Sequence, residues 1–237
     1  MDYGYMLISL LAIISILITL GAQLYIKSSY SQYTKIKSQK GLTGYETARM
    51  ILDKNDLKNI KVEKVSGYLS DHYDPSNKCV RLSESNYDGV GIANVSVAAH
   101  ECGHAIQDKE DYSFMRLRAS LVPIVNLSSK AGYIAILLGC LLGALGLVWI
   151  GILCEVVILL FQIVTLPVEF DASRRALNKI KEYKILDQKE LNGGKTMLTA
   201  AALTYVASVA STIIEKPCII AEIPPARNFV SFTPYFS

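Results

Sequence analysis

Residues 131–168 read AGYIAILLGCLLGALGLVWIGILCEVVILLFQIVTLPV, thirty-eight residues with a single charged side chain, Glu155. As one helix this stretch would be about 57 Å long, nearly twice the roughly 30 Å thickness of a bilayer's hydrocarbon core. Two antiparallel spans fit better. The turn between them is expected at one of three glycines, Gly143, Gly146 or Gly151. With the mildly apolar residues before it, the block predicts a transmembrane helical hairpin over residues 119–168.

Two further stretches are long enough and apolar enough to cross a membrane. Residues 5–26 carry no charge. A cleavable signal peptide is the alternative, but Asp2 is the only charge before the stretch and a small-residue cleavage site is missing, so we interpret it as a membrane span. Residues 196–214, rich in Leu, Ala, Val, Ser and Thr, predict a fourth span. The tail over residues 215–237 receives no assignment.

The composition agrees with a membrane protein that has one small polar domain. Of the 237 residues, 51% are hydrophobic and only 19% charged, whereas soluble domains carry nearer a quarter charged residues. The net charge of +3 is too small and too scattered to indicate a nucleic-acid-binding surface, so we expect no nucleic-acid partner. The five cysteines are an odd number without paired spacing, so we expect reduced thiols.

Basic residues indicate the orientation of the chain in the membrane. Lys27, Lys35, Lys37 and Lys40 follow the first span, and seven Lys or Arg residues lie in residues 169–195. Because cytoplasmic loops carry an excess of Lys and Arg, both polar segments are expected in the cytoplasm. These segments are a domain over residues 27–118 and a helix or loop over residues 169–195.

The polar domain shows both helix and strand patterns. A capping box beginning at Thr43 predicts a short helix to about Lys54. Residues 60–65 alternate between apolar and charged side chains, as a half-buried strand does. Residues 68–73 and 78–82 flank an Asp-Pro-Ser-Asn turn. We therefore expect a small antiparallel sheet.

The sequence His-Glu-Cys-Gly-His at residues 100–104 lies in a helix predicted over residues 91–107. Histidines four apart project from the same helix face, as two zinc ligands with Zn–N distances of about 2.0–2.1 Å require. Glu101 is placed to take a proton from a metal-bound water rather than to bind the metal. The alternative is two histidines on a helix face with an incidental acid, but the chain has only 3 histidines, and this arrangement would arise by chance on the order of once in a thousand sequences.

A catalytic zinc needs a third protein ligand and one open position. His72 could be that ligand, a contact to the reaction's oxyanion, or a structural residue. Glu169 is the stronger candidate because two membrane spans between His104 and Glu169 return the chain to the side that it left. The hydroxyl groups of Tyr73 and Tyr205 could donate to an oxyanion.

Several other polar residues have two interpretations each. Glu155 is either functional, for example in transport, or a protonated acid near the hairpin turn. Arg174 and Arg175 could bind substrate carboxylates or a supporting acid, although basic residues at this depth usually anchor the chain to lipid headgroups. Cys102 faces away from the two histidines by its spacing, and core packing is its expected role.

Four segments carry a resemblance to a known family. They are GLTGYETARMIL (41–52), SDHYDPSNKCVRLSE (70–84), VAAHECGHAIQD (97–108) and TLPVEFDASRRAL (165–177). In this order and spacing they resemble the YugP-like bacterial integral-membrane zinc metallopeptidases, over about residues 5–210. The resemblance implies a zinc-dependent endopeptidase with a glutamate-zincin type of site.

In the related glutamate-zincins the third ligand is the Glu that opens an ExxxD segment, and the Asp supports the site. Carried over, this places the third ligand at Glu169. Ser173 stands where the supporting Asp would be, so the resemblance leaves that role to Ser173 or to Asp171.

The sequence thus predicts a mostly helical α+β membrane protein with about four transmembrane helices and a small cytoplasmic zincin-like domain. We expect one Zn²⁺ per chain, held by His100, His104 and Glu169, with Glu101 as general base for hydrolysis of peptide or membrane-protein substrates. The expected location is the cell membrane, with the active site at the cytoplasmic face. The alternative function is a non-catalytic membrane protein that zinc stabilises.

Overall fold

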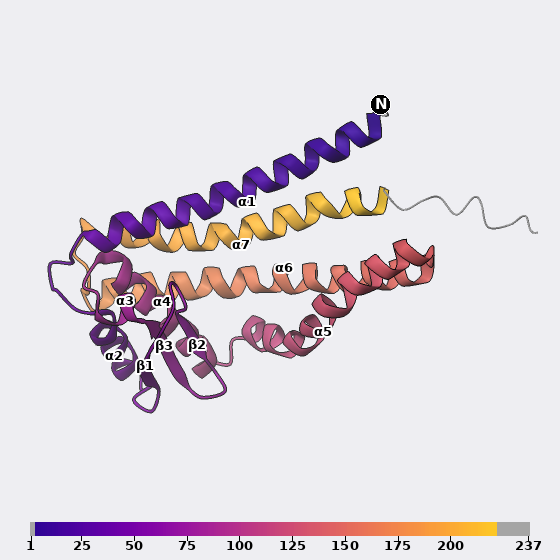
Figure 1. Ribbon diagram of the computed structural model, residues 1–237. Coiled ribbons are helices and arrows are strands. Elements are labelled where there is room, and N and C mark those ends of the chain that lie inside the picture. Colours follow the sequence, from indigo (N-terminus) through magenta and orange to yellow (C-terminus); the bar gives the residue numbers. More distant parts are fainter. Residues whose placement is uncertain (1–2, 222–237) are drawn as a thin grey trace, which may run out of the picture.

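The computed structural model describes residues 3–221, and the side chains of residues 6–214. Four of the described helices are long. They extend from a small globular end that contains the short elements (Figure 1). The elements in chain order are α1 (Tyr3–Lys35), α2 (Gly44–Lys54), β1 (Lys61–Val65), β2 (His72–Asp74), β3 (Cys79–Ser83), α3 (Glu84–Asp88), α4 (Ile92–Lys109), α5 (Ser113–Leu142), α6 (Leu145–Glu182) and α7 (Glu190–Ala221). The tail considered above lies outside the described residues beyond Ala221.

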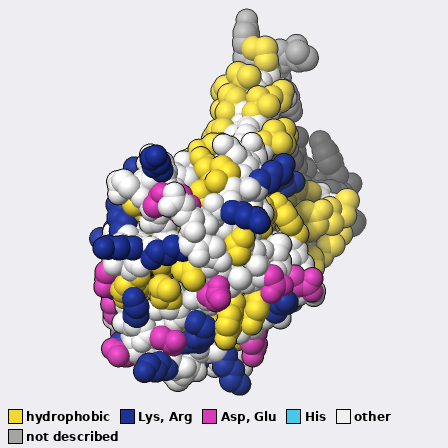
Figure 2. All heavy atoms as spheres, turned by 90° about the vertical axis from the view of Figure 1, so that its left-hand side faces the viewer, with side chains coloured by type: hydrophobic (Ala, Val, Ile, Leu, Met, Phe, Trp, Pro, Cys, Tyr) yellow, Lys and Arg dark blue, Asp and Glu magenta, His cyan; other side chains and the backbone are white. Residues whose placement is uncertain are grey.

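Within the described residues, four helices are long and apolar enough to cross a membrane, as predicted. They are Met6–Lys35, Ser113–Leu142, Leu145–Glu182 and Glu190–Ile214. Large apolar side chains on them face outward, including Tyr133 and Leu141, which are 70% and 72% exposed. Figure 2 shows hydrophobic side chains along the protruding helices and charges of both signs on the globular end. Apolar surfaces on the helices and charged side chains on the globular end are the distribution that a bilayer around the helices requires.

The second and third of these helices, α5 and α6, form a helical hairpin that extends beyond the residues 119–168 expected from the sequence at both ends. The chain reverses at Gly143, one of the three glycines considered for the turn, which adopts a left-handed φ of 64°. The two helices then run close together: a Cβ on Gly139 would lie 2.8 Å from the backbone nitrogen of Val148. Small residues at helix contacts allow such close packing within membranes. Pro123 lies inside α5, which bends along its length (Figure 1).

The sheet has three strands in the order β1-β3-β2. The pair β2–β3 is antiparallel around the predicted turn, but β1 runs parallel to β3. The expectation of a wholly antiparallel sheet is therefore wrong for β1. The connection after β1 passes through left-handed residues, Gly67 at φ 113° and Leu69 at φ 51°, and carries β2 to the far side of β3. Alternation in sequence identifies a strand's two faces but does not specify its neighbour.

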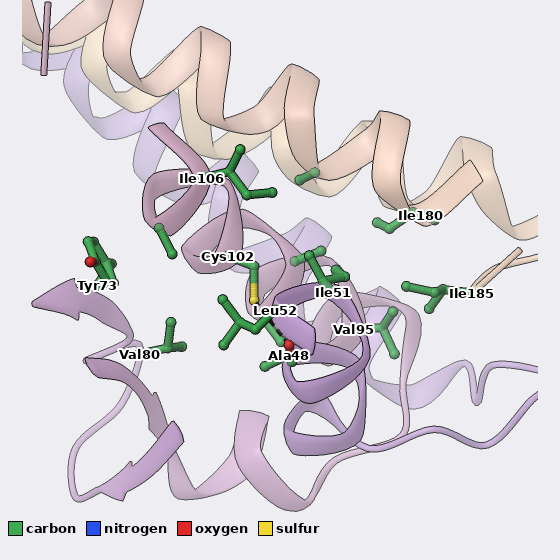
Figure 3. Packing of buried hydrophobic residues seen from close by; sticks show 14 of the residues in the cluster. Ala48, Ile51, Leu52, Tyr73, Val80, Val95, Cys102, Ile106, Ile180 and Ile185 are labelled. Atoms are coloured by element: carbon green, nitrogen blue, oxygen red, sulfur yellow. Dashed lines mark hydrogen bonds between the residues drawn. The ribbon is translucent and has the colours of Figure 1, made fainter. Parts of the chain in front are cut away.

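The core of the globular end lies between α2, the sheet, α4 and α6 (Figure 3). Its fully buried side chains include Ile51, Leu52, Leu82 and Ile180. Cys102 belongs to this core, with its Sγ 3.6 Å from the carbonyl oxygen of Ala48. The cysteines whose side chains are described are free thiols, and they are Cys79, Cys102, Cys140 and Cys154.

Asp108, near the end of α4, connects this helix to the sheet and to α5. Its Oδ2 accepts a hydrogen bond of 2.7 Å from the Tyr73 hydroxyl and one from the Lys78 amine. Its Oδ1 lies 3.0 Å from Nη1 of Arg116. Burial alone would raise the pKa of the Asp108 carboxyl. The hydrogen bonds from Lys78 and Tyr73 and the charges of Lys78 and Arg116 outweigh burial, so the pKa lies below its usual value.

We expect replacement of Asp108 by Asn to lower stability in a pH-dependent way. A carboxyl whose pKa is lower in the folded chain stabilises the fold above the unfolded pKa, about 3.9, and this stabilisation is lost as the pH falls through the folded pKa. Asp108→Asn should therefore cost about 1–3 kcal/mol near neutral pH, and the cost should shrink as the pH falls below about 4.

The measurement is the thermal unfolding of the full chain in detergent at several pH values. Asp56→Asn is the control, because the Asp56 side chain is 92% exposed and its nearest cation, Lys109, is 3.5 Å away. A stability difference between Asp108→Asn and wild type that is the same at pH 3 and pH 7 would contradict the assigned ion-pair network.

Candidate metal centre

The helix α4 places both histidines of the His-Glu-Cys-Gly-His sequence on one face, as their spacing predicts. The imidazole rings of His100 and His104 lie 4.8 Å apart between centroids. His104 is 8% exposed, whereas His100 is half-buried. Two imidazoles therefore point into the same space at the edge of the core.

Glu169 joins them from α6. Its Oε2 lies 3.3 Å from Nε2 of His100 and 3.7 Å from Nε2 of His104. One ligand atom from each of the three residues lies within 4.8 Å of the others. The carboxylate is 3% exposed. The hairpin of α5 and α6 thus returns the chain to the globular end and brings the candidate third ligand to the two histidines.

The dimensions of this group fit a zinc ion. Tetrahedral zinc with bonds of about 2.0–2.1 Å holds its ligand atoms roughly 3.3–3.4 Å apart. The distances of 3.3 and 3.7 Å from Oε2 of Glu169 to the two imidazole nitrogens are close to that value. Two imidazoles and one carboxylate are also a donor set that zinc uses in catalytic sites. The residues present therefore fit the metal.

Gln107 fixes the orientation of His104. Its Nε2 donates to the carbonyl oxygen of Val168 at 2.8 Å and to Oδ2 of Asp171 at 3.0 Å. Because both partners can only accept, the amide oxygen of Gln107 faces Nδ1 of His104, 2.9 Å away. That nitrogen therefore carries the proton, which leaves the lone pair of Nε2 available to a metal held between the three candidate ligands.

Of the two residues considered as supporting groups, Ser173 contacts a candidate ligand directly and Asp171 does so through Gln107. The hydroxyl of Ser173 is 3.2 Å from Nδ1 of His100. Asp171 accepts a hydrogen bond from Gln107, and Gln107 in turn contacts Nδ1 of His104. Arg174 and Arg175 each form an ion pair with Asp171. Of the alternatives considered for the two arginines, contact with a supporting acid is therefore the one that the structure contains.

Glu101 lies beside the histidines in the wall of a cavity of about 250 Å³ that also exposes His100 and Glu169. Burial raises the pKa of the Glu101 carboxyl, although the nearby histidine charges act in the opposite direction. The remaining walls come from α1, α4, α7 and the loop before β2, and they are largely apolar. They are formed by Ile26, Leu69, Asp71, Val97, Met197, Leu198, Ala201, Thr204 and Tyr205.

His72 and Tyr73 have other partners. His72 is exposed on β2, with its Nδ1 2.8 Å from the carbonyl oxygen of Ser70. The hydroxyl of Tyr73 donates to Asp108. Neither belongs to the group of three whose ligand atoms converge. Tyr205, by contrast, lines the cavity.

Sequence reasoning missed two residues here, Gln107 and Arg118. Gln107 follows His104 by three positions and so lies on the same helix face, which is a signal that could have found it. Arg118 places Nη1 3.8 Å from Oε1 of Glu169. It lies on α5, and no local pattern connects it to the site.

We expect Gln107→Leu to weaken zinc binding by about 10–100-fold, because the proton position and ring orientation of His104 would no longer be fixed. Competition with a chromophoric chelator on the purified full chain measures this affinity. Gln188→Leu is the matched control, since Gln188 is exposed and outside the site. Equal affinities for Gln107→Leu and the control would show that the Gln107 contact does not orient the ligand.

Comparison with known proteins places the chain in a family. The sequence model of the family described as "Putative neutral zinc metallopeptidase" matches residues 8–220. A Bacillus subtilis (strain 168) protein, described as "Putative membrane protease YugP", is 44% identical over 210 residues, which cover 89% of this chain and 93% of the relative. No solved structure matches. The chain therefore belongs to this family of zinc metallopeptidases.

Proposed function

We propose that this chain is a membrane-embedded zinc endopeptidase in which His100, His104 and Glu169 hold one zinc ion and Glu101 is the general base. The observation that carries the proposal is the position of the Glu169 carboxylate, 3.3 Å from Nε2 of His100 in the wall of a cavity that also exposes Glu101. When bound at such a site, zinc polarises a carbonyl group and lowers the pKa of water to about 7.

Glu101 handles the proton in this proposal. It takes a proton from the attacking water and returns it to the leaving amine when the peptide C–N bond breaks. The reaction consumes one water and yields a carboxyl group and an amine. The side chain is suited to this role because it is only 7% exposed and lines the same cavity as the ligands. Bulk water therefore has little access to the proton that it holds.

Tyr205 is our candidate donor to the negative charge that develops on the carbonyl oxygen. It lines the cavity and carries a hydroxyl group, whereas the hydroxyl of Tyr73 is occupied by Asp108. A donor aimed at this oxygen stabilises the transition state more than the substrate.

The substrate is proposed to bind as an extended strand. β2 is an edge strand of the sheet, and Asp71, the residue before it, lines the cavity. A peptide that pairs with the open edge of β2 would be directed toward the metal centre. The apolar cavity walls, which include Val97 and Met197, favour peptide or membrane-protein substrates with an apolar side chain beside the cleaved bond.

The proposed location is the cell membrane, with the site at the cytoplasmic face. The globular end and the polar ends of α6 and α7 lie together (Figure 1). The basic residues that follow the first span and those of residues 169–195 belong to this end. An excess of Lys and Arg marks the cytoplasmic side, which supports this orientation.

Replacement of Glu101 by Gln tests the proposal. Glu101→Gln keeps the ligands, so zinc content should be unchanged, whereas peptide hydrolysis should fall by about 10²–10⁴-fold because the amide is not a general base. The full chain is purified in detergent, its zinc is measured, and cleavage is followed with a panel of apolar peptides and membrane-protein substrates.

Glu84→Gln is the control, because Glu84 is exposed on α3. Hydrolysis that survives in zinc-loaded Glu101→Gln would refute the assigned base. A zinc-loaded wild type that cleaves nothing in a broad panel would support the alternative, a non-catalytic membrane protein that zinc stabilises.

A further inference from the structure

A second cavity, of about 310 Å³, opens between α6 and α7. Three basic residues line it, Arg174 and Lys181 from α6 and Lys195 from α7, and no acidic residue among those that the structure describes does. Apolar side chains also line it, including Phe170 and Ala202. The cavity thus combines an apolar wall with convergent positive charge.

The positive charge in this cavity is poorly compensated. Within the described part of the chain, Lys181 and Lys195 have no ion-pair partner, whereas neighbouring Lys179 lies 2.9 Å from Glu182. Arg174 pairs with Asp171, but this acid also accepts from Arg175. Like charges gathered without a counter-ion repel one another, so a bound anion would stabilise this arrangement.

The cavity lies where the helices leave their apolar segments. The apolar block of α6 ends at residue 168, just before Phe170, and the apolar part of α7 begins near residue 197, just after Lys195. Phe170 is 49% exposed. At this level a membrane presents phospholipid headgroups, and basic pockets between transmembrane helices bind acidic headgroups there.

We propose that this cavity binds the phosphate headgroup of an anionic phospholipid. Lys181, Lys195 and Arg174 contact the phosphate, and an acyl chain lies along Phe170 and Ala202. A free phosphate would satisfy the cations alone, but the apolar wall matches only a ligand with a hydrocarbon chain. The inference depends on the chain spanning a membrane and does not depend on peptidase activity.

Native mass spectrometry and thermal unfolding of the full chain in detergent test the site. The added ligands are phosphatidylglycerol, phosphatidylcholine and inorganic phosphate. We expect phosphatidylglycerol to bind and raise the melting temperature, with an affinity that falls as salt rises. The double variant Lys181→Gln/Lys195→Gln should bind it on the order of tenfold more weakly, while Lys181→Arg/Lys195→Arg should retain binding.

The matched control is Lys184→Gln/Lys189→Gln, which removes two exposed lysines of the same segment that do not line the cavity. Unfolding in phosphatidylcholine alone establishes that all variants fold. The proposal is overturned if phosphatidylcholine binds as well as phosphatidylglycerol. It is also overturned if both Lys→Gln double variants lose equal affinity, or if inorganic phosphate stabilises the wild type as much as phosphatidylglycerol does.

Discussion

The close crossing of α4 and α6 brings the three candidate metal ligands together. A Cβ on Gly103, between the two histidines, would lie only 2.5 Å from the backbone oxygen of Ala172, so only glycine allows the helices to approach this closely. The crossing buries the carboxylate of Glu169 against two imidazoles. A buried carboxylate is costly without partners, and here Arg118 adds a positive charge 3.8 Å from its other oxygen.

The same crossing is held together by the groups that orient the ligands. Gln107 contacts His104 on its own helix and both Val168 and Asp171 on α6. The hydroxyl of Ser173 reaches back from α6 to His100. Movement of one helix relative to the other would therefore disturb the ligands and their supports together. The hairpin of α5 and α6 contributes by returning the chain to the globular end (Figure 1).

The sequence alone was sufficient to predict features that depend on a local pattern, and features that the chain topology restricts. The histidine spacing specifies one helix face, and the capping box at Thr43 forms as expected. Glu169 could be identified as a candidate ligand from the sequence, because a hairpin must return the chain to the same side. The parallel pairing of β1 with β3 could not be predicted from the sequence, because contacts between residues distant in sequence decide which strands pair. Arg118 was missed for the same reason, since its partner is fifty-one positions away.

Metal analysis of purified variants of the chain decides whether α4 and α6 together hold one zinc ion. Zinc per chain is measured for the wild type, for Glu169→Ala and for Glu182→Ala, which removes an acid at the end of α6 that pairs with Lys179 and leaves the centre intact. We expect about one zinc in the wild type and in Glu182→Ala, and a large loss in Glu169→Ala. Undiminished zinc in Glu169→Ala would contradict this expectation.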